Sequence, residues 1–215
     1  MDKKLITILV PAYNEQEVLN MLYERLNTLI SNIPSYDFEI LFVNDGSKDN
    51  TLNIIMDLRK NDSRVCYVNL SRNYGKETAM LAGLDYSKGD AVIIIDADLQ
   101  DPPELIPEMI KYWEEGYDDI YAKRRSRKGE SFLKKFTSKM YYRILQKFTR
   151  IDIGKDAGDF RLLDRRCVEA LKQMRESQRY TKGLYSWIGY KKKEILFDRD
   201  PRAARKNKME LWKID

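Results

Sequence analysis

The first half of the chain alternates short apolar runs with amphipathic stretches. Four runs of apolar, mostly β-branched and aromatic residues predict buried strands, at residues 5–10, 38–43, 65–70 and 91–95. Between them, apolar residues recur at helical spacing, which predicts helices beginning near residues 18, 49 and 77. Pro102-Pro103 opens a further helical pattern. This alternation predicts an α/β fold with a doubly wound, mostly parallel sheet and helices on both faces.

Composition narrows the chemistry that such a domain can perform. The 215 residues are 43% hydrophobic, enough for a real core, and the longest apolar runs are too short for a transmembrane helix. The N-terminus does not resemble a signal peptide, and the two cysteines, Cys66 and Cys167, are expected to be free thiols in a reducing compartment. Because the chain has no histidine, triads and zinc sites that use His are excluded.

Charge is distributed unevenly along the chain. Residues 1–122 carry 11 basic and 22 acidic side chains, whereas residues 123–150 carry 11 basic and one acidic. Residues 151–215 carry 17 basic and 11 acidic side chains. The acidic part is suited to a divalent cation, and the basic part to phosphate, an anionic membrane or nucleic acid.

The most specific local signal is the acidic pair that follows the fourth apolar run. Asp96 and Asp98 stand at the carboxyl end of a predicted buried strand, where ligands of doubly wound sheets bind. Two carboxylates at this spacing, with the amide oxygen of Gln100, are suited to Mg²⁺ or Mn²⁺. The alternative is a polar loop in which Asp98 or Asp101 caps the next helix.

Asp45 follows the second predicted strand, in the sequence Asn44-Asp45-Gly46-Ser47. A carboxylate there can accept a hydrogen bond from a nucleobase, while Asp49 and Thr51 are expected only to cap the following helix. No glycine-rich phosphate loop is present, so a nucleotide would be held mainly through metal and side chains.

Taken in order, four segments of the sequence resemble a family 2 glycosyltransferase with the GT-A fold. They are residues 10–15, 43–51, 71–76 and 96–104, which read VPAYNE, VNDGSKDNT, SRNYGK and DADLQDPPE. The resemblance extends over residues 5–200 and is greatest to the branch that glycosylates polyprenyl phosphates, which includes dolichyl-phosphate mannose synthases and bactoprenol glucosyltransferases. GDFRLLDR at residues 158–165 also matches this branch.

The resemblance implies a role for each matching residue. The nucleotide sugar would be contacted by Pro11, Tyr13, Glu15, Asp45, Lys76, Asp96 and Asp98. The metal, Mg²⁺ or Mn²⁺, would be held by Asp96, Asp98 and Gln100. Asp98 and Asp159 would be the catalytic residues, Asp159 mainly by orienting the acceptor. The acceptor phosphate would lie near Arg124, Arg125 and Arg202. The alternative for Asp159 is a structural ion pair with Arg161 or Arg165.

Two departures from the branch concern the end of the chain. The branch usually follows the residue matching Arg202 with Ala-Gly, whereas this chain has Ala203-Ala204, which puts the role of Arg202 in doubt. Many members continue into membrane helices. We therefore expect a catalytic domain at residues 1–200 and a basic tail at 201–215, which either belongs to a natural short form or leads to such helices in a longer form.

The basic segment at residues 123–150 has two interpretations. Apolar residues recur every four positions among Lys and Arg, at Phe132, Phe136, Met140, Ile144 and Phe148. This pattern suits an amphipathic helix lying on an anionic membrane, and equally a core helix with a solvated basic face. Since a lipid-linked acceptor stays in the bilayer, we favour the membrane, with the enzyme peripheral at its cytoplasmic face.

The leading hypothesis is thus a metal-dependent, inverting transfer of a hexose from a nucleotide sugar to polyprenyl phosphate. UDP-glucose is favoured over GDP-sugars as donor. The nearest alternative keeps the fold and changes the acceptor to a cell-surface polysaccharide or teichoic-type polymer. A nucleic-acid-binding module is a distant alternative, because it leaves the acidic strand ends unexplained and no nucleic-acid motif is present.

Overall fold

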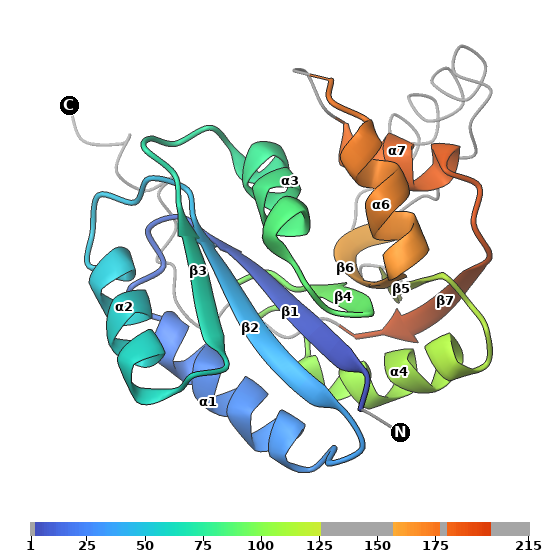
Figure 1. The fold of residues 1–215 in the computed structure, drawn as a ribbon, viewed down its shortest axis with the longest axis horizontal. Coiled ribbons are helices and arrows are strands. Elements are labelled where there is room, and N and C mark those ends of the chain that lie inside the picture. Colours follow the sequence, from blue (N-terminus) through green and yellow to red (C-terminus); the bar gives the residue numbers. More distant parts are fainter. Residues whose placement is uncertain (1–2, 126–156, 177–179, 199–215) are drawn as a thin grey trace.

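A seven-stranded sheet lies between two layers of helices in the computed structural model, which describes residues 3–125, 157–176 and 180–198 (Figure 1). The strands are β1 Leu5–Ala12, β2 Asp37–Asn44, β3 Val65–Asn69, β4 Ala91–Ile94, β5 Asp119–Arg124, β6 Ala157–Asp164 and β7 Lys192–Phe197. The helices are α1 Leu19–Ser31, α2 Thr51–Asn61, α3 Lys76–Tyr86, the 3₁₀ turn η1 Pro103–Leu105, α4 Ile106–Glu114, α6 Arg165–Gln173 and α7 Thr181–Trp187.

The sheet has the strand order β3-β2-β1-β4-β6-β5-β7. The pairs β1–β2, β1–β4, β2–β3 and β5–β7 are parallel, whereas β6 runs antiparallel to both of its neighbours, β4 and β5. The predicted doubly wound, mostly parallel sheet is therefore confirmed. The reversed direction of β6 was not anticipated from the sequence.

Helices cover both faces of the sheet, and each face has its own apolar core. One core packs α1, α2 and α4 under the sheet, and α1 contributes Leu19, Leu22, Leu26 and Ile30 at helical spacing. The other core packs α3, α6 and Tyr185 of α7 against the opposite face. Figure 1 shows these two layers, with α1, α2 and α4 below the sheet and α3, α6 and α7 above it.

The helices begin close to the predicted positions. The stretch that follows Pro102-Pro103 differs only in that it begins with a 3₁₀ turn. Pro103 begins this turn, and the α-helix proper starts at Ile106.

Asp49 Oδ1 accepts a hydrogen bond from the Thr51 amide at 3.0 Å, but Asn50 is the residue that precedes α2 and no side chain caps this helix. The capping roles expected of Asp49 and Thr51 are therefore wrong, and the Thr51 hydroxyl instead accepts the Glu15 amide. Both cysteines are free, as predicted.

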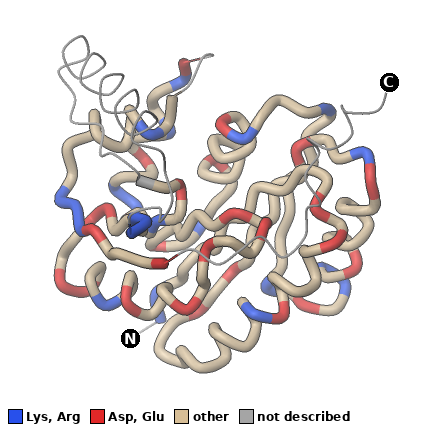
Figure 2. Tube along the Cα trace, turned by 180° about the vertical axis from the view of Figure 1, so that it is seen from behind, with Lys and Arg blue, Asp and Glu red and all other residues tan. Residues whose placement is uncertain are grey.

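The uneven charge of the sequence reappears in the fold. In Figure 2, many basic positions gather on the side of the molecule that carries β5, β6 and β7. Most of the basic segment 123–150 lies outside the described residues, as does the tail 201–215. Every helix in the described ranges is too short or too polar to span a bilayer.

Gly46 allows two loops at the carboxyl edge of the sheet to touch backbone to backbone. It has φ +62°, and a Cβ placed on it would lie 2.3 Å from the carbonyl carbon of Arg72 and 2.6 Å from the Asn73 nitrogen. Backbone atoms cannot move aside as a flexible side chain can. The loop after β2 and the loop after β3 therefore form one unit that only glycine permits at this position.

We predict that Gly46→Ala lowers the free energy of unfolding by about 3 kcal/mol, because overpacking adds to the strain of a positive φ. Gly116→Ala is the matched control, since Gly116 has φ +84° but a Cβ added to it would meet nothing within 4 Å. That control should lose only about 1 kcal/mol. Urea unfolding with equal m-values measures both changes, and equal losses would show that the close approach has no energetic consequence.

Candidate active site at the carboxyl edge of the sheet

The acidic pair follows β4 at the carboxyl edge, where the sequence placed it. Asp98 Oδ1 accepts a hydrogen bond from the Gln100 amide at 3.1 Å, so the loop turns back on itself directly after the pair. Leu99 adopts φ +59° with its side chain buried. A branched side chain rarely adopts this conformation, and backbone strain of this kind is typical of functional loops.

Lys76 lies between the two acidic strand ends. Its Nζ is 2.6 Å from Asp96 Oδ1 and 2.8 Å from Asp96 Oδ2. The same Nζ is 2.7 Å from Asp159 Oδ2 on β6. Because β6 is antiparallel to β4, its first residues lie at the edge where β4 ends, which brings Asp159 to Asp96. Three predicted site residues from distant parts of the sequence thus meet at one ammonium group.

The electrostatics of this cluster favour the charged forms of Asp159 and Lys76. Burial alone would raise the pKa of Asp159, but the nearby Lys76 ammonium outweighs it and holds that pKa below its usual value. Burial alone would lower the pKa of Lys76, but Asp96 and Asp159 raise it. Asp159 is therefore a carboxylate at neutral pH. Its Oδ1 is buried and has no hydrogen-bond partner among the described residues.

The sequence suggested, as an alternative, that Asp159 forms a structural ion pair with Arg161 or Arg165. Asp159 does form an ion pair, but with neither of these arginines. Arg161 donates from Nη1 to both oxygens of Asp119 at 3.1 Å, and Arg165 pairs with Glu169 at 3.3 Å. The cation beside Asp159 is instead Lys76, 83 residues away in the sequence.

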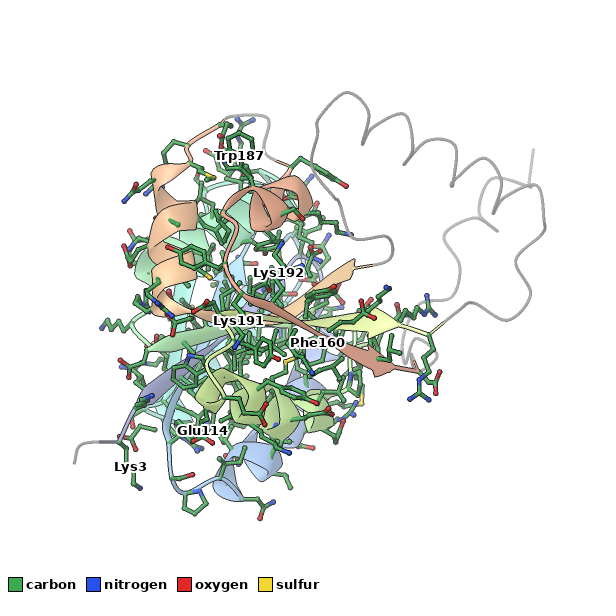
Figure 3. All side chains as sticks on the ribbon, turned by 90° about the vertical axis from the view of Figure 1, so that its right-hand side faces the viewer. Lys3, Glu114, Phe160, Trp187, Lys191 and Lys192 are labelled. Carbon is green, nitrogen blue, oxygen red and sulfur yellow. The ribbon has the colours of Figure 1, made fainter. Side chains whose placement is uncertain are left out.

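Arg161 fixes the strand that carries Asp159, a role that the sequence alone did not suggest. Phe160 packs toward α4 (Figure 3), so its neighbours Asp159 and Arg161 face the α3 and α7 layer. The Arg161 guanidinium lies 3.4 Å from the ring centroid of Tyr185 and donates to the Gly158 carbonyl at 3.1 Å. The sequence contained one signal for this role: Asp159 and Arg161 are two positions apart, so in a strand their side chains share one face of the sheet.

Asp45, predicted to meet the nucleoside, joins the two loops that Gly46 brings together. Its side chain is almost fully buried, and its two oxygens accept the amides of Tyr74 at 2.8 Å and Gly75 at 2.9 Å. This anchoring places the start of α3, and hence Lys76. The nucleoside role of Asp45 stays a prediction.

The other residues predicted for the nucleoside lie at the end of β1. Pro11 pairs with Val43 within the sheet, and Tyr13 follows at the same edge. The Glu15 amide donates to Thr51 Oγ1 at 2.9 Å, which ties this loop to α2. Pro11 near the end of β1, Tyr13 and Glu15 in the loop after it, and Asp45 in the loop after β2 therefore lie at the same edge of the sheet.

The arginines predicted for the acceptor phosphate are partly described. Arg124 ends β5 and Arg125 follows it, at the edge where β6 begins, because Lys123 is opposite Ala157. Arg125 Nη1 lies 3.7 Å from Asp198 Oδ2. Arg202 lies outside the described residues.

The donor set fits a divalent cation that is completed by a ligand. In the described ranges no three or more Cys, Asp or Glu side chains gather as a metal site. Mg²⁺ and Mn²⁺, however, commonly bind one or two carboxylates and take their remaining ligands from water and substrate phosphates. Asp96 already holds a positive charge with both oxygens, so the position accommodates a cation. Asp96, Asp98 and Gln100 would be its protein ligands.

Comparison with known proteins identifies relatives of the chain. It is 49% identical over 209 residues to the "Uncharacterized glycosyltransferase sll0501" of Synechocystis, covering 97% of this chain and 65% of that protein. It is 40% identical over 209 residues to the "Bactoprenol glucosyl transferase" of Shigella phage SfX, covering 97% of this chain and 68% of that protein. The chain thus spans about two thirds of the length of each relative.

A solved structure shares the fold. Glucosyl-3-phosphoglycerate synthase from Mycobacterium tuberculosis, in complex with Mn²⁺, UDP-glucose and phosphoglyceric acid, superposes with a TM-score of 0.60 at 18% identity. The alignment covers 97% of this chain and 74% of that one. Residues 7–172 match the family described as "Glycosyl transferase family 2". The chain belongs to glycosyl transferase family 2.

Proposed function

We propose that the chain transfers a hexose from a nucleotide sugar to a polyprenyl phosphate, undecaprenyl or dolichyl, with inversion at the anomeric carbon. UDP-glucose is the favoured donor, Mg²⁺ or Mn²⁺ the cofactor, and the cytoplasmic face of the membrane the place of reaction. Family membership and the name of the phage relative support this assignment. The observation that carries it is the convergence of Asp96 and Asp159 on Lys76.

The donor side of the site would be formed by the ends of β1, β2 and β4. Asp96, Asp98 and Gln100 would hold the divalent ion, which when bound neutralises the charge that grows on the leaving nucleoside diphosphate. Pro11, Tyr13, Glu15 and Asp45 would contact the nucleoside. The strained turn at Leu99 helps to hold the acidic pair in place before the donor arrives.

The acceptor side would be formed by the start of β6 and the end of β5. A phosphate monoester has its second pKa near 6, so an acceptor phosphate is already largely dianionic at neutral pH. Because the pKa of Asp159 is lowered, its carboxylate is a weak base. Asp159 therefore acts mainly by orienting the acceptor and stabilising positive charge at the anomeric carbon, and it removes only a residual proton.

The reaction forms one bond and breaks one bond at the anomeric carbon. A phosphate oxygen of the acceptor attacks that carbon while the bond to the donor diphosphate breaks, and the configuration inverts. Arg124 and Arg125 would offset the negative charge of the acceptor phosphate, which a lone carboxylate at Asp159 would repel.

Transfer of label tests the proposal directly. With UDP-[¹⁴C]glucose, Mn²⁺ and undecaprenyl phosphate, we expect label in the organic lipid extract, and none when Mn²⁺ is replaced by EDTA. Omitting the lipid is the control for spontaneous partition. Label that enters only a polysaccharide or teichoic-type polymer would replace the proposed acceptor, and no transfer from any UDP- or GDP-sugar would overturn the assignment.

Two carboxyl-to-amide changes separate the donor and acceptor roles. Asp98→Asn should lower kcat roughly 1,000-fold, since it removes a carboxylate that would hold the divalent ion, and with that ion the charge that offsets the leaving diphosphate. Asp159→Asn should lower it only roughly 10- to 100-fold, because the acceptor needs little deprotonation. Asp85→Asn, which removes an exposed ion pair with Arg175, should act like the wild type. Equal losses at positions 98 and 159 would contradict this division of roles.

Membrane attachment through the basic segment 123–150 is the last part of the proposal. We expect the protein to float with anionic vesicles at low salt and to be released at high salt, because exposed charges are screened. Neutral vesicles are the control. Failure to bind anionic vesicles at low salt would remove this part of the proposal and leave the chemistry untouched.

A further inference from the structure

We propose that Lys76 is an internal counter-cation that holds the place of the divalent ion and thereby makes metal binding depend on the donor. In the absence of ligand its ammonium occupies the acidic position. When metal and nucleotide diphosphate enter together, the ammonium moves onto the diphosphate. This inference rests on the proposed function, because it concerns the same nucleotide-sugar site.

The contacts of Lys76 are those of a cation in a binding site. Its ammonium lies within 2.8 Å of both oxygens of Asp96 and 2.7 Å from one oxygen of Asp159. A metal ion that uses Asp96 must displace these hydrogen bonds. Asp159 Oδ1 is buried and has no hydrogen-bond partner among the described residues, so the Lys76 ammonium is the cation that offsets this carboxylate there.

The backbone on both sides of Lys76 is anchored, so the exchange needs only a side-chain movement. On one side, the Gly75 amide donates to Asp45 Oδ2 at 2.9 Å. On the other, Glu77 accepts the Thr181 amide at 3.1 Å and also the Thr181 hydroxyl, which joins α3 to α7. The Lys76 side chain itself is 39% exposed and has four rotatable bonds with which to swing aside.

Charge determines which species can replace the ammonium. A divalent ion alone would have to settle beside a displaced ammonium that has lost its anionic partners. A donor diphosphate brings two negative charges of its own, which give the ammonium a new partner. Lys76 should therefore oppose binding of metal alone and favour binding of metal and donor together.

A purely structural ion pair would behave differently. If Lys76 only joined β4 to β6, its removal would destabilise the fold and weaken both ligands, or neither. The proposed coupling instead moves the two affinities in opposite directions, a result that loss of stability does not produce.

The experiment measures Mn²⁺ binding by electron paramagnetic resonance of the free ion, without nucleotide, and then UDP-glucose binding by calorimetry at saturating Mn²⁺. In Lys76→Met we expect roughly tenfold tighter binding of Mn²⁺ alone and roughly tenfold weaker binding of UDP-glucose. Lys76→Gln, the second neutral variant, should shift both affinities the same way. Lys60→Met is the matched control, because Lys60 also pairs with an aspartate, Asp57 at 2.8 Å, but on the exposed surface of α2.

A double variant tests whether the Mn²⁺ that binds more tightly to Lys76→Met uses Asp96. The gain in Mn²⁺ affinity should disappear when Asp96→Asn is added to Lys76→Met. If the variants that fold bind Mn²⁺ no tighter than the wild type, while the wild type binds UDP-glucose with Mn²⁺, the counter-cation role is overturned and the proposed function stands. If the wild type binds no UDP- or GDP-sugar with Mn²⁺, the proposed function itself fails.

Discussion

The candidate site depends on one ammonium group placed between two carboxylates. β4 ends and the antiparallel β6 begins at the same edge of the sheet, and each brings an aspartate there. Without a cation these charges would repel each other in a partly buried position. The Lys76 ammonium therefore allows Asp96 and Asp159 to lie within hydrogen-bond reach of one group, and it keeps Asp159 ionised.

A second ion pair, formed by the buried side chains of Arg161 and Asp119, lies next to this arrangement on β5 and β6. The side chains of Arg161 and Asp119 are 3% and 0% exposed, so their desolvation offsets much of their mutual attraction. Arg161 Nε and the Tyr185 hydroxyl have no hydrogen-bond partner among the described residues. We interpret this cluster as a device for fixing position, since Arg161 joins β5, β6 and α7 around Asp159 more than it adds stability.

Much of the fold follows from local sequence, whereas the pairing within the site does not. Uninterrupted apolar runs were enough to predict β1 to β4, and the polar residues after them were rightly placed on one edge, because parallel strands share the direction of their carboxyl ends. The antiparallel course of β6 depends on the tertiary pairing of Ile94 with Arg161, which no local pattern contains. For the same reason the sequence suggested nearby Arg161 or Arg165 as partner of Asp159, and not Lys76. The burial of Asp45 against two backbone amides was likewise invisible, since only the fold brings those loops together.

The position of β6 also bears on how the protein assembles as it is synthesised. β1 to β4 and their helices are contiguous in the first hundred residues, so this half of the sheet can pair before the later strands have been made, although its β1–β4 pairing already joins residues as far apart as Ile6 and Ala91. β6 joins β4 only after about sixty further residues have been made. A nascent chain can thus complete the first four strands before the strand bearing Asp159 exists, and the contact between Asp159 and Lys76 forms only when that late strand docks.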